Sequence, residues 1–155
     1  MNAAKIMSLL LSVILMLTTG CKMNSWRSDE LVGNWRLESV GGVPAQTAAT
    51  VVTFTLDHDG RFTANALPPG FLRLQDIKQD QKIVGSGTWT LARSDGGREE
   101  RVRLTFISVE GSNGRNLPYG AELFIQGSSR APRLYYFKGD PDENQRVVFQ
   151  REPPR

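Results

Sequence analysis

The sequence predicts an all-β protein, an eight-stranded antiparallel up-and-down β-barrel with at most one short helix. Apolar and polar residues alternate with period two over most of the chain from residue 29 onward. The chain contains 15 Gly and 8 Pro, and turn-forming residues separate the alternating segments. Sequential antiparallel strands of this length can close on themselves, which removes the edges that promote aggregation. A two-sheet β-sandwich is the alternative architecture.

The first three expected strands follow one helical turn. Residues 28–32 are expected to form that turn with Ser28 as its N-cap, because a serine oxygen can accept from a free backbone N–H. Residues 33–40 then alternate apolar with polar side chains. Residues 51–56 and 61–66 repeat the alternation on either side of an Asp-His-Asp-Gly turn, whose glycine readily adopts a positive φ.

An irregular segment precedes the other five strands. Residues 67–83 include Pro68 and Pro69, which exclude a central strand. Apolar residues at a spacing of three in the same segment favour a short helix or a lid-like loop. The strands that follow are predicted at residues 85–92, 100–108, 121–125, 134–137 and 146–151.

A single barrel domain, residues 29–152, is expected to follow an N-terminal targeting segment. Residues 1–20 combine a basic start, an apolar run over residues 6–17 and small residues at the end, as secretory signals do. At ~1.5 Å per residue the run extends about 18 Å, less than the ~30 Å of a bilayer core. Residues 21–28 are interpreted as a tether and residues 153–155 as a tail.

Cys21 is the single cysteine, which excludes an internal disulfide and a cysteine zinc site. With Thr18, Thr19 and Gly20 before it, Cys21 resembles the lipobox of bacterial lipoproteins. The resemblance implies a diacylglycerol on the Cys21 thiol, cleavage before this residue and acylation of the new amino terminus. Since two or more acyl chains hold a protein firmly, the expected partner is a membrane, bound through this lipid.

The residue that follows Cys21 indicates the membrane to which a lipoprotein is sorted. In Gram-negative lipoproteins an aspartate there tends to retain the protein at the inner membrane, and this chain has Lys22. The resemblance therefore implies an outer-membrane lipoprotein on the periplasmic side. In a Gram-positive host it implies the outer face of the plasma membrane.

A Gly-X-Trp-X-Leu motif occurs twice, at residues 33–37 and 87–91. Trp35 and Trp89 are expected to be large apolar plugs of the barrel. The first copy opens the first strand after a helical turn, and Arg151 ends the last strand. This arrangement resembles the lipocalin or calycin superfamily, which implies that Arg151 packs on Trp35 in a cation–π contact that closes the barrel.

The chain also resembles small bacterial secreted or lipid-anchored domains of unknown function. The shared features are the Gly-X-Trp opening, an Asp-Gly-X-Phe hairpin at residues 59–62, a Gly-X-Gly-X-Trp strand at 85–89 and a Gly-Asp-Pro-Asp turn at 139–142. This second resemblance implies no activity.

Composition and motifs exclude several classes of function. The formal net charge of +3 is spread among interleaved acids and bases, so nucleic acid is not an expected partner. His58 is the only histidine and lies in an expected turn, which leaves no triad. Residues 140–144 resemble the start of a calcium loop, but Gln145 and Arg151 replace its glycine and glutamate. We therefore expect no enzyme, no metal and no cofactor.

The expected function is binding by a lipid-anchored envelope barrel. An eight-stranded barrel is wide enough to be filled by side chains or to hold one small ligand. Its partner is expected to be a small apolar ligand or an envelope protein. Phe71, Leu72, Leu117 and Tyr119 are the candidate residues around an open mouth. The alternatives are an inhibitor or immunity-type protein, which a filled interior would favour, and a structural envelope lipoprotein.

Overall fold

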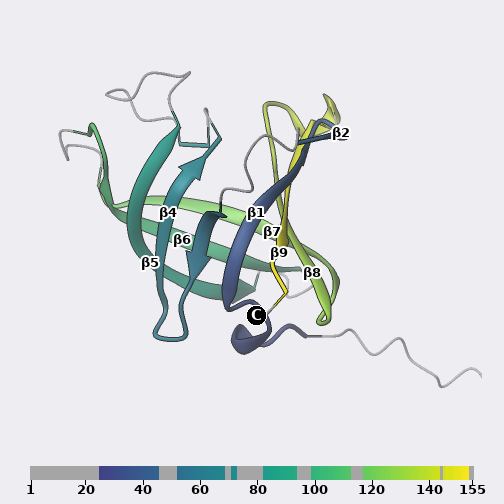
Figure 1. The fold of residues 1–155 in the computed structure, drawn as a ribbon, viewed down its shortest axis with the longest axis horizontal. Helices are drawn as coiled ribbons and strands as arrows, with labels where there is room; N and C mark the ends of the chain where they lie inside the picture. The colour runs from purple at the N-terminus through teal and green to yellow at the C-terminus, as the bar shows by residue number, and fades with distance from the viewer. Residues whose placement is uncertain are drawn as a thin grey trace, which may run out of the picture.

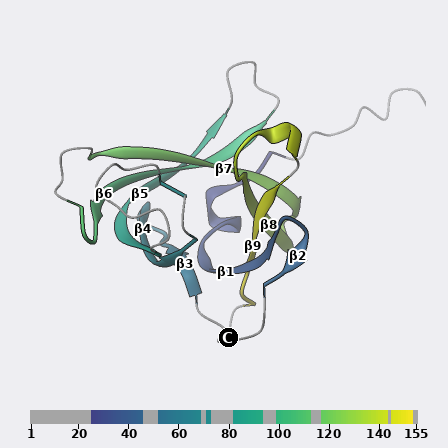
Figure 2. The same cartoon turned by 90° about the horizontal axis from the view of Figure 1, so that it is seen from above.

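The chain folds into a closed antiparallel β-barrel in the computed structural model (Figure 1). The strand order is β2-β1-β3-β4-β5-β6-β7-β8-β9, and β1 also pairs with β9. That last pairing closes eight strands around one interior, and β2 remains outside the closed ring (Figure 2). The predicted eight-stranded antiparallel barrel is confirmed, and the β-sandwich alternative is wrong.

The structure describes residues 25–45, 52–68, 71–72, 82–93, 99–112, 117–143 and 145–153. The strands are β1 (Gly33–Val40), β2 (Val43–Pro44), β3 (Val52–Leu56), β4 (Arg61–Leu67), β5 (Ile83–Arg93), β6 (Glu100–Val109), β7 (Tyr119–Ser128), β8 (Ala131–Phe137) and β9 (Arg146–Arg151). Two 3-10 turns, η1 (Ser28–Glu30) and η2 (Pro141–Glu143), complete the elements. Within these ranges no helix is long and apolar enough to cross a bilayer.

Three local details differ from the prediction. Ser28 is the first residue of η1, and the N-cap residue is Arg27, whose backbone N–H donates to the Glu30 carboxylate at 2.9 Å. The strand β2 is an addition of two residues, too short for an alternating pattern to reveal. The β7–β8 hairpin is longer than expected, since pairing continues to Ser128 and Ala131.

The alternation of side chains fills the barrel with apolar groups. Inward residues on every strand of the closed ring lose their contact with water. The largest side chains that are fully buried are Trp35, Phe54, Phe62, Phe106, Phe149, Leu31, Leu56, Leu67, Ile83, Leu104, Leu123 and Leu134. Burying this apolar surface is the dominant favourable term in folding.

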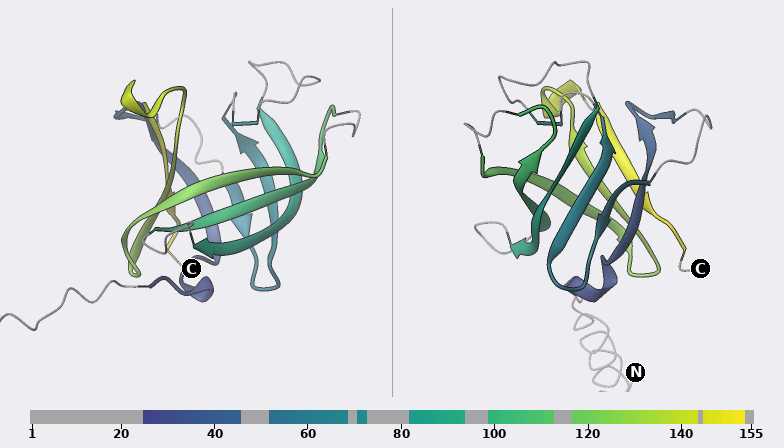
Figure 3. Two further views of the ribbon diagram at one scale, coloured as in Figure 1. Left: turned by 180° about the vertical axis from the view of Figure 1, so that it is seen from behind. Right: turned by 60° about the vertical axis from the view of Figure 1, so that its left-hand side comes forward.

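The strands β5, β6 and β7 are long and strongly curved, and they wrap one side of the barrel (Figure 3). The β5–β6 register shifts between Ser86 and Gly87, so the backbones approach closely at this bulge. A Cβ atom on Gly87 would lie 1.9 Å from the Thr105 carbonyl oxygen and 2.9 Å from the Phe62 ring. Gly87 is therefore required by close packing.

Replacing Gly87 should destabilise the barrel, whereas the same change at Gly120 should not. We expect Gly87→Ala to lower the free energy of unfolding by ~1–3 kcal/mol, because the new methyl group meets backbone. Gly120→Ala is the matched control, since a Cβ atom there has no neighbour within 4 Å. Urea unfolding followed by tryptophan fluorescence measures both, and equal effects would contradict the packing argument.

Candidate functional site

One end of the barrel is closed by η1 and the first tryptophan. Leu31 and Trp35 are both fully buried beneath this turn. The Trp35 indole Nε1–H donates to the Leu31 carbonyl oxygen at 3.0 Å. The Thr53 hydroxyl donates to the Trp35 carbonyl oxygen at 2.8 Å. The turn, the opening strand and β3 are thus bound together by satisfied polar groups.

Arg151 joins the last strand to the same end. It is the register partner of Trp35 across the β1–β9 pair. Its Cδ and Cγ atoms lie 3.4 and 3.6 Å from where a Cβ atom on Gly33 would be, and Gly33 has a φ of +135°. The guanidinium donates to the Glu30 carbonyl oxygen. Trp35 and Arg151 therefore lie side by side, and Arg151 binds the backbone of η1, not the face of the indole.

The second Gly-X-Trp motif binds a different turn at this end. Trp89 is 5% exposed, and its Nε1–H donates to the Asp57 carbonyl oxygen at 2.9 Å. Its backbone N–H donates to the Gly60 carbonyl oxygen at 2.7 Å. Each tryptophan of the repeated motif thus fixes a turn through its indole N–H.

The opposite end holds the four residues predicted around the mouth. Phe71 is 9% exposed and Leu72 is 4% exposed, so both are part of the core. Leu117 and Tyr119 are half-buried and pack against that core. Phe71 and Leu72 belong to the β4–β5 connection, and Leu117 and Tyr119 belong to the β6–β7 connection and the start of β7.

Aromatic rings run through the interior from the closed end to this one. Trp35 stacks on Phe54 with centroids 6.0 Å apart, and Phe54 meets Phe149 edge-on at 5.1 Å. Tyr136 lies 6.2 Å from Phe149 and 4.9 Å from Phe71. This ring chain occupies the interior along its length.

The chain of rings continues on the β6 side. Phe71 lies 6.2 Å from Phe106, which in turn meets Phe62 edge-on at 4.8 Å. Edge-on pairs of this kind contribute ~0.5–1.5 kcal/mol beyond the area they bury. Phe71 thus links the two sides of the barrel, although it lies outside the strands.

Tyr136 carries a polar atom that the fold leaves unsatisfied. Its hydroxyl oxygen is buried and has no hydrogen-bond partner among the described residues. Burial raises the pKa of the Tyr136 hydroxyl above its usual value, so the group stays protonated and able to donate. Leaving such a group unpaired costs ~1–3 kcal/mol. This hydroxyl is the strongest indication of a ligand site in the barrel.

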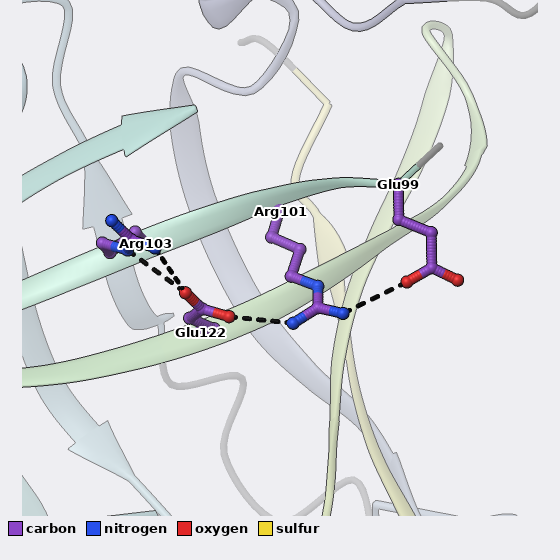
Figure 4. A network of polar contacts seen from close by, with 4 residues as sticks. All are labelled: Glu99, Arg101, Arg103 and Glu122. Carbon is purple, nitrogen blue, oxygen red and sulfur yellow. Dashed lines mark hydrogen bonds and ion pairs between the residues drawn. The ribbon is translucent and has the colours of Figure 1, made fainter. Parts of the chain in front are cut away.

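The outer surface of β6 and β7 carries a charged network (Figure 4). Glu122 accepts from Arg103 at 2.8 Å and from Arg101 at 3.0 Å. Arg101 also pairs with Glu99 at 3.2 Å. Hydrogen bonds from Arg103 and then Arg101 hold the pKa of the Glu122 carboxyl below its usual value.

The described residues offer no arrangement for metal or histidine chemistry. No three His, Cys, Asp or Glu side chains come together there as ligands. His58 is exposed in the turn between β3 and β4. Cys21 lies outside the described residues. Comparisons of the chain with protein families, with curated proteins and with solved structures gave no match.

The sequence prediction did not single out Tyr136. Period two places it inside, next to Leu134 on the same face of β8, and this signal was available. The sequence could not show that the Tyr136 hydroxyl lacks a hydrogen-bond partner, because the residues around this side chain come from β9 and from the β4–β5 connection.

The Glu122 network should stabilise the fold only above acidic pH. A carboxyl with a lowered pKa in the folded state contributes stability above its unfolded pKa, and this contribution disappears as pH falls through the folded value. We expect Glu122→Gln to be less stable than the parent at pH 7, with the gap closing below about pH 4.5. Urea unfolding across pH measures the gap.

The control is Glu110→Gln, at an exposed glutamate for which the described part of the chain shows no ion pair. At pH 7 this variant should be as stable as the parent. A Glu122→Gln gap that stays constant down to pH 3 would contradict the assignment.

Proposed function

We propose that the chain is a non-catalytic binding protein of the bacterial envelope, anchored by lipid at Cys21 and holding a small apolar ligand in its barrel. The ligand site lies at the end opposite η1. The anchor places the protein at the outer membrane on its periplasmic side, or on the outer face of the plasma membrane in a Gram-positive host. The apolar run before the lone cysteine supports the anchor.

The unpaired hydroxyl of Tyr136 carries the ligand proposal. It lies among the rings of Phe71 and Phe149, where a ligand must be apolar to replace ring contacts. The ligand must also present one acceptor, because the hydroxyl is a donor without a partner. The ligand class is therefore an apolar molecule with a carbonyl, carboxylate or similar oxygen.

Phe71 is the residue that a ligand would displace. Its backbone N–H donates to the Pro68 carbonyl oxygen at 3.2 Å, within a turn and outside the sheet. Rotation of its ring away from Tyr136 would break no hydrogen bond between strands. The barrel wall can therefore stay intact while the site is occupied.

A second candidate is an inhibitor or immunity-type protein, or a structural envelope lipoprotein. The continuous ring chain favours it, since an interior occupied by side chains leaves recognition to the outer surface. Recovery of the protein with a bound envelope protein and no small molecule would favour this candidate.

Membrane association should depend on Cys21. We expect Cys21→Ala to move the protein from the membrane fraction to the soluble fraction, because the thiol that would carry the diacylglycerol is gone. Lys22→Ala is the control and should leave the protein with the membranes. Cys21→Ala protein that still sediments with membranes would contradict lipid anchoring.

Ligand binding should depend on the Tyr136 hydroxyl. The probe is 1-anilinonaphthalene-8-sulfonate, which joins apolar rings to an anionic acceptor. We expect Tyr136→Phe to weaken probe binding several-fold, as one hydrogen bond contributes ~0.5–1.5 kcal/mol. The variant should be no less stable than the parent, because the lost hydroxyl had no partner.

Tyr135→Phe is the matched control, since the neighbouring ring lies on the outer face of β8. It should leave probe affinity unchanged. Equal affinity of the parent and Tyr136→Phe, or equal weakening by both variants, would contradict the site.

A further inference from the structure

The barrel has an arginine–aromatic face on the outside of β6–β9, formed by Arg101, Phe124, Tyr135, Phe137 and Arg146. The rings alternate along β7 and β8 with the inward residues, and none packs against the core. Each is half-buried, so part of each ring contacts water.

The members of this face are ordered by contacts with one another. Phe124 stacks on Tyr135 at 5.1 Å, and Phe137 meets both rings edge-on at 5.7 Å. The Arg101 guanidinium lies 4.5 Å from the Phe124 centroid. Arg146 lies 5.0 Å from Tyr135 and 5.3 Å from Phe137. The three rings are thus held in contact with one another, and an arginine guanidinium lies at each end of the group.

The N-terminal chain enters the barrel next to this face. The backbone N–H of Trp26 donates to the Glu100 carboxylate, and Glu100 precedes Arg101 on β6. Five residue steps separate Cys21 from Trp26. At ~3.3–3.6 Å per residue, an anchor at Cys21 holds Trp26 within about 18 Å of the membrane surface.

Two surfaces lie within that reach, and their charges differ. The closed end carries the acids Asp29, Glu30, Asp57 and Asp59 and the bases Arg27, Arg61, Arg130 and Arg151, since the Arg151 guanidinium reaches the carbonyl oxygen of Ser129 in the β7–β8 turn. The flank of β6–β9 with neighbouring β1 carries the bases Arg36, Arg101, Arg103, Arg133 and Arg146 and the acids Glu38, Glu99, Glu122 and Glu152, which pairs with Arg36 at 3.8 Å. The acids and bases of the closed end balance, whereas the flank has an excess of bases that attracts anionic phosphate groups.

Arg146 is the member best placed to bind such a phosphate. The described residues give it ring contacts and no ion pair, and its Nε is buried without a hydrogen-bond partner. Arg101, by contrast, is already paired with Glu122 and Glu99. A guanidinium held against rings loses little rotamer freedom when it binds an oxyanion.

We infer that the arginine–aromatic face rests on the surface of the phospholipid membrane that anchors the chain. The rings of Phe124, Tyr135 and Phe137 lie at the level of the headgroups, where aromatic side chains are favoured, and Arg146 binds lipid phosphate. The barrel then lies on its flank, and the end that holds Tyr136 stays open to the surrounding water. This inference rests on the proposed anchor.

In the test, the chain from Cys21 onward is coupled to vesicles through the Cys21 thiol. This chain contains every residue that the structure describes. The vesicles contain maleimide-linked lipid, phosphatidylglycerol and brominated phosphatidylcholine, and bromine quenches tryptophan that enters the headgroup region. The reporter variant is Tyr135→Trp. We expect its added fluorescence to shift to shorter wavelength and to be quenched on the vesicles.

The matched control is Thr63→Trp, on the exposed face of β4. Three strands separate β4 from β8 in either direction around the closed ring, so Thr63 faces away. Its added fluorescence should show neither the shift nor the quenching. Arg146→Gln in the reporter chain should reduce quenching on phosphatidylglycerol vesicles.

Quenching at position 63 as strong as at 135, or no quenching at either, would overturn the inference. The absence of quenching at both positions would favour a protein partner for the arginine–aromatic face. Because the coupling is chemical, the outcome is independent of whether cells acylate Cys21. Failure of this test and failure of the proposed anchor are therefore distinguishable.

Discussion

The pairing of β1 with β9 is the constraint on which the rest of the structure depends. It joins residues more than one hundred positions apart, from Trp35 with Arg151 to Val40 with Val147. Without it the sheet would have two long edges and an apolar face open to water. With it, the inward side chains of the eight strands of the closed ring meet in one interior, and the last strand reaches the turn η1 through Arg151.

The two ends of the barrel differ in whether their buried polar groups have hydrogen-bond partners. At the closed end both indole N–H groups and the Arg151 guanidinium donate to carbonyl oxygens of turns. At the other end the buried hydroxyl of Tyr136 has no hydrogen-bond partner within the part of the chain that the structure describes. Native interiors rarely leave such groups unpaired. This contrast favours stability as the role of the first end and binding as the role of the second.

Adjacent residues on β8 illustrate how strand geometry assigns roles. Tyr136 points into the ring chain, while Tyr135 stacks on Phe124 outside. The two tyrosines are alike in sequence, and only the side of the sheet separates them. The proposed ligand and the proposed membrane contact thus use opposite faces of one strand, so binding at one site leaves the other free.

The sequence by itself determined the eight strands of the closed ring and their antiparallel order, because period-two alternation and turn residues act over a few neighbours, but it did not reveal β2. It also indicated Trp35, Trp89 and Arg151 as residues that close the barrel. Only the tertiary structure decided that Arg27 and not Ser28 is the N-cap residue of η1, that Phe71 inserts between Phe106 and Tyr136, and that the Tyr136 hydroxyl has no hydrogen-bond partner among the described residues. These features depend on register and closure, which bring together side chains that no local pattern relates.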